Sequence, residues 1–142
     1  MISSQFEARV KRVDSTDVDL AVQVTLTYDA GTDPFAVQAI FEIPGEDDRV
    51  WHFSRELLAR GSRSLTPYGK GDVKFRHFPL QGALLMCLRT GGQGPNEASH
   101  ADIALPQAEV VQFLKDTHEV AQVTEQECDA LVDVFLKELF EA

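Results

Sequence analysis

The chain has 142 residues, of which 44% are hydrophobic and 25% are charged. This length and balance are typical of one globular domain with its own core, and they exclude an intrinsically disordered chain. No apolar run approaches the roughly 20 residues of a membrane-spanning helix, and the N-terminal MISSQFEARV lacks the basic and then apolar layout of a secretory signal. We therefore expect a cytoplasmic protein without membrane insertion, folded as a single domain over residues 1–142.

The formal net charge of −10 is unevenly distributed along the chain. Residues 49–89 hold 8 Lys/Arg and 2 Asp/Glu, whereas residues 1–48 hold 3 and 10, and residues 90–142 hold 2 and 11. A basic segment of charge +6 therefore lies between two acidic ones. Nucleic-acid-binding domains are usually basic overall, because phosphate contacts supply most of their affinity. This chain could bind nucleic acid only by gathering its positive charge on one face.

The first part of the chain shows the period-two alternation of strands. Residues 6–10 alternate apolar and charged side chains, and residues 35–43 alternate again after the turn-forming DAGTDP. RVWHF follows PGEDD as a short fourth strand. The clearest alternation follows DSTD, where one face would hold Val18, Leu20, Val22, Val24, Leu26 and Tyr28. These spacings predict an antiparallel meander.

The rest of the chain predicts one short helix, further strands and C-terminal helices. In SRELLARG, Ser54 is the expected N-cap and Gly61 the expected stop. DVKFRHF and ALLMCLR are strands, and the second, apolar on both faces, is expected at the centre of the sheet. A weaker strand, SHADIAL, precedes one helix with Pro106 in its first turn and another with a capping box at Thr124 and Glu127. The fold class is α+β, with antiparallel sheet of about seven strands ordered as four strands, a helix, three strands and two helices.

Within VWHFSRELLARG, three side chains could be parts of a hydrolase: His52, Ser54 and Glu56. A Ser–His–acid arrangement needs the histidine within hydrogen-bond reach of the serine and the acid behind the histidine. On a strand, the Cβ atoms of His52 and Ser54 lie roughly 6–7 Å apart and point the same way, and Glu56 lies beyond the serine. Helix capping explains these residues with fewer assumptions, so we predict no catalytic residue.

The sequence gives metal and phosphate sites little support. The histidines are scattered, and the nearest candidate ligand pair, His100 and Asp102, fits an exposed strand face equally well. GKGD at 69–72 lacks the spacing of a phosphate-binding loop, and a strand rather than a helix follows it. Cys87 and Cys128 lie in apolar surroundings and are expected to be small buried residues without a disulfide. We therefore expect no metal and no cofactor.

Four motifs in succession resemble the SsgA-like family of actinomycete sporulation and cell-division proteins. They are TYD, DPFAVQAIF, VWHFSRELLARG and GKGDVKF. The matching positions are Tyr28, Asp29, Asp33, Pro34, Phe35, Ala36, Val37, Trp51, Phe53, Arg55, Leu57, Leu58, Gly61, Gly69, Gly71, Asp72 and Val73. The family pattern accepts alanine at the Ser54 position and does not require histidine at position 52, which is a second argument against a catalytic site.

The resemblance implies a non-enzymatic regulator of sporulation and cell division. Such a protein would be a chaperone-like adaptor that recruits or localises division proteins, such as the tubulin-like FtsZ or SsgA-like paralogues, to septa. The resemblance also implies a fold similar to the whirly-type single-strand nucleic-acid binders and a homotrimer. We name Arg55, Lys74 and Arg76, all in the basic segment, as candidate partner-binding residues.

The alternative interpretation is a single-stranded nucleic-acid-binding protein that uses the basic segment 49–89. Lys74 and Arg76 would contact phosphates beside aromatic rings that stack on bases. The candidate rings are Trp51, Tyr68, Phe75 and Phe78. Packing in the core is the competing explanation for these rings, and the acidic net charge argues against nucleic acid as a partner.

Overall fold

The computed structural model describes residues 1–90 and 99–120 and shows a sheet of seven antiparallel strands in the spatial order β4-β3-β2-β1-β7-β6-β5. The strands are β1 (Ile2–Val13), β2 (Thr16–Tyr28), β3 (Ala36–Glu42), β4 (Arg49–Ser54), β5 (Val73–Phe78), β6 (Ala83–Thr90) and β7 (Ser99–Pro106). Helix α1 (Arg55–Gly61) lies between β4 and β5, and the 3₁₀ turn η1 (Pro79–Gln81) joins β5 to β6. A second helix begins at residue 107 and is described to residue 120. The predicted order is thus confirmed as far as this helix, whereas the capping box at 124–127 lies outside the described residues.

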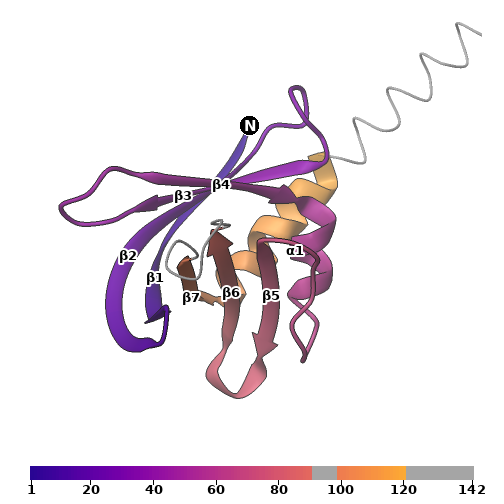
Figure 1. Ribbon diagram of the computed structural model, residues 1–142. Coiled ribbons are helices and arrows are strands. Elements are labelled where there is room, and N and C mark those ends of the chain that lie inside the picture. The colour runs from indigo at the N-terminus through magenta and orange to yellow at the C-terminus, as the bar shows by residue number, and fades with distance from the viewer. Residues whose placement is uncertain (91–98, 121–142) are drawn as a thin grey trace, which may run out of the picture.

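The sheet is strongly curled, and its two ends enclose the core together with the helices. β1 and β2 bend along their length, and β3 and β4 cross above β5, β6 and β7 (Figure 1). α1 and the helix from residue 107 lie at the same side of the molecule, where the sheet is open (Figure 1). Both halves of the sheet and both helices contribute to the core, for example through Leu26, Val37, Phe53, Leu58, Phe75, Met86, Leu105, Val110 and Phe113. None of the helices in the described ranges is long and apolar enough to span a membrane.

Two of the residues predicted to lie on buried strand faces are exposed instead. On β2 the alternation holds from Val22 to Tyr28, but Leu20 is 45% exposed because it lies in the end of the β1–β2 hairpin, beyond the core. In the next segment Val37, Ala39 and Phe41 are buried, whereas Phe35 is 74% exposed. Phe35 precedes β3 and belongs to the turn, so the strand pattern does not apply to it.

The structure corrects the predicted places of β6 and Pro106. β6 is next to the edge strand β5, whereas β1 occupies the middle of the sheet. The face of β6 that carries Leu85 and Cys87 is half-buried, which explains why its sequence is apolar on both sides. β7, the weakest strand by sequence, pairs with both β1 and β6 and so joins the two halves of the sheet. Pro106 is the last residue of this strand, opposite Ala83, and the helix begins one residue later.

Candidate functional site

β4 passes directly into α1, and this junction holds the residues that suggested a hydrolase. Ser54 Oγ accepts a hydrogen bond from the backbone N–H of Leu57 at 2.9 Å, and Ser54 itself is extended (φ −73°, ψ 145°), as an N-cap requires. Glu56 points along the helix to Arg60, with an Oε1–Nη2 distance of 2.7 Å. His52 is exposed and forms no hydrogen bond with Ser54 in the described part of the chain. The predicted capping role of Ser54 is confirmed, and these side chains do not form a catalytic arrangement.

Gly61 has a different role from the predicted helix stop. It is the last residue of α1, and the C-cap is Ser62 in a right-handed conformation (φ −66°, ψ −13°) rather than a left-handed glycine. A Cβ at position 61 would lie 2.4 Å from the Cβ of Phe75. Phe75 is fully buried and meets the ring of Phe53 edge-on at 5.2 Å between centroids. Glycine is therefore required here because α1 lies directly against β5.

The GKGD segment forms the entry to β5, as predicted. Gly69 (φ +134°) and Gly71 (φ +92°) adopt backbone conformations that favour glycine. A Cβ at Gly69 would also lie 2.7 Å from the carbonyl oxygen of Val73. The carbonyl oxygen of Asp72 accepts a hydrogen bond from the N–H of Arg89 at 2.8 Å, which continues the strand pairing. These motif residues shape the backbone.

The turn between β2 and β3 brings three of the four motifs together. The Tyr28 hydroxyl donates a hydrogen bond to the carbonyl oxygen of Pro34 at 2.9 Å, and the N–H of Phe35 donates to Asp33 Oδ1 at 3.0 Å. The N–H of Arg55, from the start of α1, donates to the carbonyl oxygen of Phe35 at 2.8 Å. The Arg55 guanidinium lies 5.9 Å from the centre of the buried Tyr28 ring. The result is a braced turn that holds Phe35 in solvent.

Asp29 completes this turn from its other side. Its carboxylate accepts hydrogen bonds from the N–H of Gly31 at 3.1 Å and from Thr32 Oγ1 at 3.0 Å. Its carbonyl oxygen accepts from the N–H groups of Thr32 and Asp33. The aspartates of the motif therefore fix the turn, and sequence spacing alone could not show that the β4–α1 junction would meet it.

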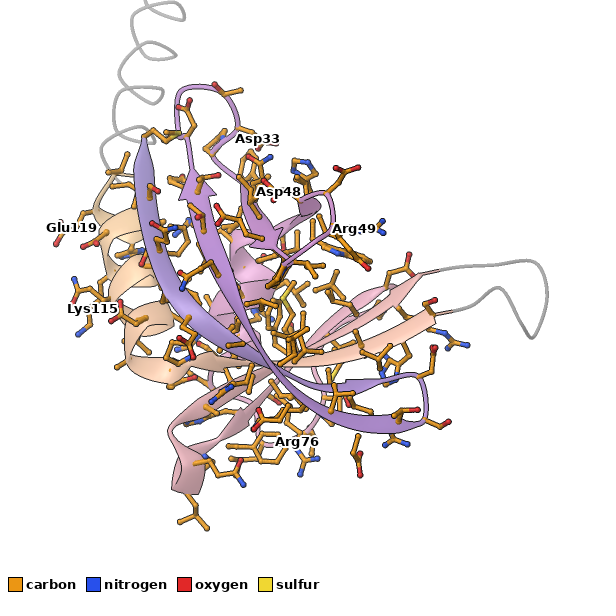
Figure 2. The ribbon with its side chains drawn as sticks, turned by 90° about the vertical axis from the view of Figure 1, so that its left-hand side faces the viewer. Asp33, Asp48, Arg49, Arg76, Lys115 and Glu119 are labelled. Atoms are coloured by element: carbon orange, nitrogen blue, oxygen red, sulfur yellow. The ribbon has the colours of Figure 1, made fainter. Side chains whose placement is uncertain are left out.

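The three candidate partner-binding residues do not form one site. Arg55 is half-buried beside the Tyr28 turn, whereas Lys74 and Arg76 lie on the exposed face of β5. Figure 2 shows Arg49 next to Asp48 and well apart from Arg76. The basic segment 49–89 is therefore spread over several surfaces in the fold.

Most of the aromatic rings proposed for base stacking are buried or are in contact with other side chains of the protein. Phe75 is 0% exposed, so its predicted role in stacking is wrong. Trp51 is half-buried against the core. The Arg76 guanidinium lies 4.5 Å from the centre of the Phe78 ring, and the Tyr68 hydroxyl accepts a hydrogen bond from an arginine of α1. Core packing and side-chain contacts explain these rings better than nucleic-acid binding does.

Lys74 and Arg76 belong to a basic surface that sequence analysis missed, because half of it comes from β1. Strand pairing places Lys74, Cys87, Asp102 and Arg12 side by side across β5, β6, β7 and β1. The neighbouring row consists of Arg76, Leu85, Ala104 and Arg9. Paired residues share one face of a sheet, so these two rows face outward together, opposite the core. We call this surface the outer trough. The charge count along the sequence did not indicate the β1 cations, because they lie in the acidic segment 1–48.

His100 and Asp102 do share a strand face, as predicted, with His100 Nε2 3.2 Å from Asp102 Oδ1. The described residues contain no group of three or more His, Cys, Asp or Glu side chains that could hold a metal ion. Cys87 lies opposite Asp102 and is free in the described part of the chain. Burial, followed by the Asp102 carboxylate, raises the pKa of the Cys87 thiol to about 11. This thiol is therefore protonated near neutral pH and is a poor nucleophile.

The described residues thus define a class of protein: a curled antiparallel sheet covered by helices, whose motif residues brace turns and junctions. Comparison with known proteins gives the family. The family described as "Streptomyces sporulation and cell division protein, SsgA" matches residues 22–127, and the chain belongs to it. The suspected family resemblance is confirmed.

Two relatives illustrate the match. A sporulation-specific cell division protein of Frankia casuarinae, Francci3_3418, is 38% identical over 98 residues, which are 69% of this chain and 62% of that protein. Sporulation-specific cell division protein SsgB of Streptomyces coelicolor is 32% identical over 111 residues, or 78% of this chain and 76% of that protein. The chain therefore spans less than two thirds of the Frankia relative.

Solved structures share the fold. A structure from work on SsgB mutations and longitudinal cell division during sporulation of Streptomyces coelicolor matches with a TM-score of 0.68 and 31% identity, over 89% of this chain and 93% of that chain. An SsgA-like sporulation-specific cell division protein from Thermobifida fusca also matches with a TM-score of 0.68, at 20% identity, over 96% and 93% of the two chains. The second likeness concerns the fold alone.

Proposed function

We propose that this protein is a non-enzymatic regulator of sporulation-linked cell division. It acts as a chaperone-like adaptor at division septa, where it recruits or localises FtsZ-type division proteins or SsgA-like paralogues. The names of the two relatives support a role in sporulation-linked cell division, since both are sporulation-specific cell division proteins. The observation that carries the adaptor role is the braced turn, because the family motifs hold an aromatic side chain in solvent.

Phe35 has the properties of an interface anchor. Its N–H is bonded to Asp33 and its carbonyl oxygen to Arg55, while Pro34 restricts the backbone before it. Because the turn is ordered before any partner arrives, binding would cost little additional backbone entropy. Burying the ring, now 74% exposed, in an apolar pocket of a partner would contribute about 1.5–3 kcal/mol. Aromatic anchors of this kind dominate many protein interfaces.

Co-sedimentation with FtsZ polymers tests this function. The wild-type protein should pellet with the polymers, and Phe35→Ala should weaken binding by about tenfold. Leu65→Ala is the matched control, since Leu65 is also a large exposed apolar residue, at 62%, in the loop between α1 and β5. The experiment is repeated with an SsgA-like paralogue present to detect indirect recruitment. Absence of binding and of any effect on polymer length in both formats would rule out recruitment of FtsZ.

Family likeness also supports a homotrimer and a kinship with the whirly-type fold. Light scattering at micromolar concentration should give about three times the chain mass of 15.8 kDa. A monomer mass would contradict the homotrimer but would leave the proposed adaptor role unaffected.

A single-stranded nucleic-acid-binding protein is the second candidate function. The observation in its favour is the outer trough, where Lys74 and Arg76 lie on the same face as Arg9 and Arg12. In a salt titration, the logarithm of the oligonucleotide binding constant should fall linearly with the logarithm of the salt concentration. Binding should be lost in Lys74→Glu/Arg76→Glu. No affinity at low salt would exclude this function.

A further inference from the structure

We propose that the outer trough is a docking site for an acidic, partly apolar segment of a partner protein. This inference rests on the proposed adaptor function and assigns the partner's chemistry at a second surface, separate from Phe35. Two rails of cations define the trough, one on β5 with Lys74 and Arg76, and one on β1 with Arg9 and Arg12. The floor between them comes from β6 and β7. Three strand spacings separate the rails, or about 14 Å, which leaves room for one extended peptide.

The floor is hollowed at two places. A cavity of about 580 Å³ is lined by Lys11, Phe78, Gln81, Ala83, Leu85 and Ala104. A second cavity, of about 420 Å³, lies further along the same face, and its lining includes Lys74, Cys87, Arg89 and His100. The first cavity has a mainly apolar floor beside a lysine, which suits an apolar side chain that is next to a carboxylate.

A local irregularity in β1 concentrates charge on this face. The register between β1 and β7 shifts between Val10 and Arg12, with Lys11 as the extra residue of β1 in the bulge. Arg12 pairs with Asp102 on the outer face, and Lys11 lines the cavity with Leu85. In a regular strand these two neighbours would point to opposite faces, whereas a bulge can aim both to the same side.

The charge of the trough is opposite to that of the chain. Residues 9–13, 73–78, 83–90 and 99–106 together hold six Lys/Arg and one acid, Asp102, and Asp72 adds a second carboxylate at the second cavity, in a chain of net charge −10. Within the described residues Lys74 and Arg89 form no ion pair. Arg9 and Lys11 share one exposed carboxylate, Asp19, at 3.7 and 3.4 Å, and exposed pairs of this kind contribute little. These cations are therefore available to carboxylates of a partner.

The floor favours a peptide over nucleic acid. Leu85 and Ala104 are aliphatic, and the Phe78 ring is already covered by Arg76. Asp102 places a carboxylate in the floor, where it would repel a phosphate backbone. A short acidic segment can instead place its carboxylates at the rails and its apolar side chains over Leu85.

Fluorescence anisotropy with a labelled peptide of alternating Glu and Leu residues tests the proposal. The intact protein should bind this peptide, should bind a Lys/Leu peptide at least about tenfold more weakly, and should release the Glu/Leu peptide as salt rises. Lys11→Glu/Lys74→Glu should weaken binding by about tenfold or more, since it reverses the β1 cation that lines the first cavity and one cation of the β5 rail. Leu85→Asn should weaken binding of the Glu/Leu peptide but not of a Glu/Gly peptide.

Arg49→Glu/Lys115→Glu is the control, because it changes the net charge equally and both residues lie away from Arg76 (Figure 2). This control should bind like the wild type, and Lys11→Gln/Lys74→Gln replaces the reversal variant if circular dichroism shows that the latter is unfolded. Equal loss in both double variants, or no loss in either, would overturn the proposal. So would tighter binding of an oligothymidylate than of the Glu/Leu peptide, which would assign the trough to nucleic acid. The assay contains no division protein, so its failure is distinguishable from failure of FtsZ recruitment.

Discussion

Replacing Gly61 with alanine tests the closest approach between α1 and the sheet. The new Cβ would lie 2.4 Å from the Cβ of Phe75 and 3.2 Å from its Cγ, whereas carbon atoms in contact lie about 3.5–4.0 Å apart. Because the nearest atom is a Cβ, no rotamer of Phe75 relieves the overlap, and α1 must move away from β5. Such overpacking costs about 1–3 kcal/mol, against about 1 kcal/mol gained in helix propensity. The net loss is therefore at most about 2 kcal/mol, and we expect about 1 kcal/mol.

Urea denaturation followed by tryptophan fluorescence of Trp51 measures this loss. The midpoint should fall at constant m-value, and Tm should fall by about 2–4 °C in a chain of 142 residues. Gly31→Ala is the control, because its Cβ would make only an ordinary contact with Asp29 Oδ1 at 3.5 Å and the same change should leave stability equal or slightly higher. If Gly61→Ala is as stable as the wild type, the inferred packing of α1 on β5 is wrong.

Three other measurements check the motif region and the trough. Ser54→Ala should lower the free energy of unfolding by about 1 kcal/mol through loss of the N-cap, with FtsZ co-sedimentation unchanged; loss of co-sedimentation in a folded Ser54→Ala protein would show that the serine does more than cap the helix. Tyr28→Phe should cost about 1 kcal/mol because the bond from its hydroxyl to Pro34 is lost, and an unchanged urea midpoint would contradict this bond. In a Cys128→Ser background, iodoacetamide should alkylate Cys87 slowly at pH 8 and faster as the pH rises towards the thiol pKa of about 11. Asp102→Asn should speed the reaction by removing a carboxylate that raises the pKa of the Cys87 thiol. Rapid alkylation of the Cys128→Ser protein at pH 8 would refute the assigned environment of Cys87.

Local sequence patterns were sufficient to predict most of the strands and α1. Alternation from Val22 to Tyr28 reports a buried face, since one side of a strand must meet the core. The Ser54 cap was also predictable, because its hydrogen bond reaches only three residues along the chain. Leu20 and Phe35 were misjudged because periodicity does not show where the core ends.

The candidate surfaces were much less predictable. The glycine at position 61 is required by Phe75, which is 14 positions away in the sequence, and helix-stop rules gave the wrong reason for it. The Tyr28 turn depends on a backbone bond from Arg55, and the outer trough joins β1 to β5 through two intervening strands. Charge counted along the chain therefore pointed to segment 49–89, although the fold divides that segment between several faces.

By itself, the sequence determined the family, the α+β class, the order of elements as far as residue 120 and the capping role of Ser54. These properties depend on residue types at short spacings, which hydrophobic periodicity, capping and motif order record directly. Only the tertiary structure decided how the motifs meet around Phe35 and which cations share the outer trough. Those arrangements depend on strand order, pairing register and the β1 bulge, which are set by contacts between residues far apart in the chain.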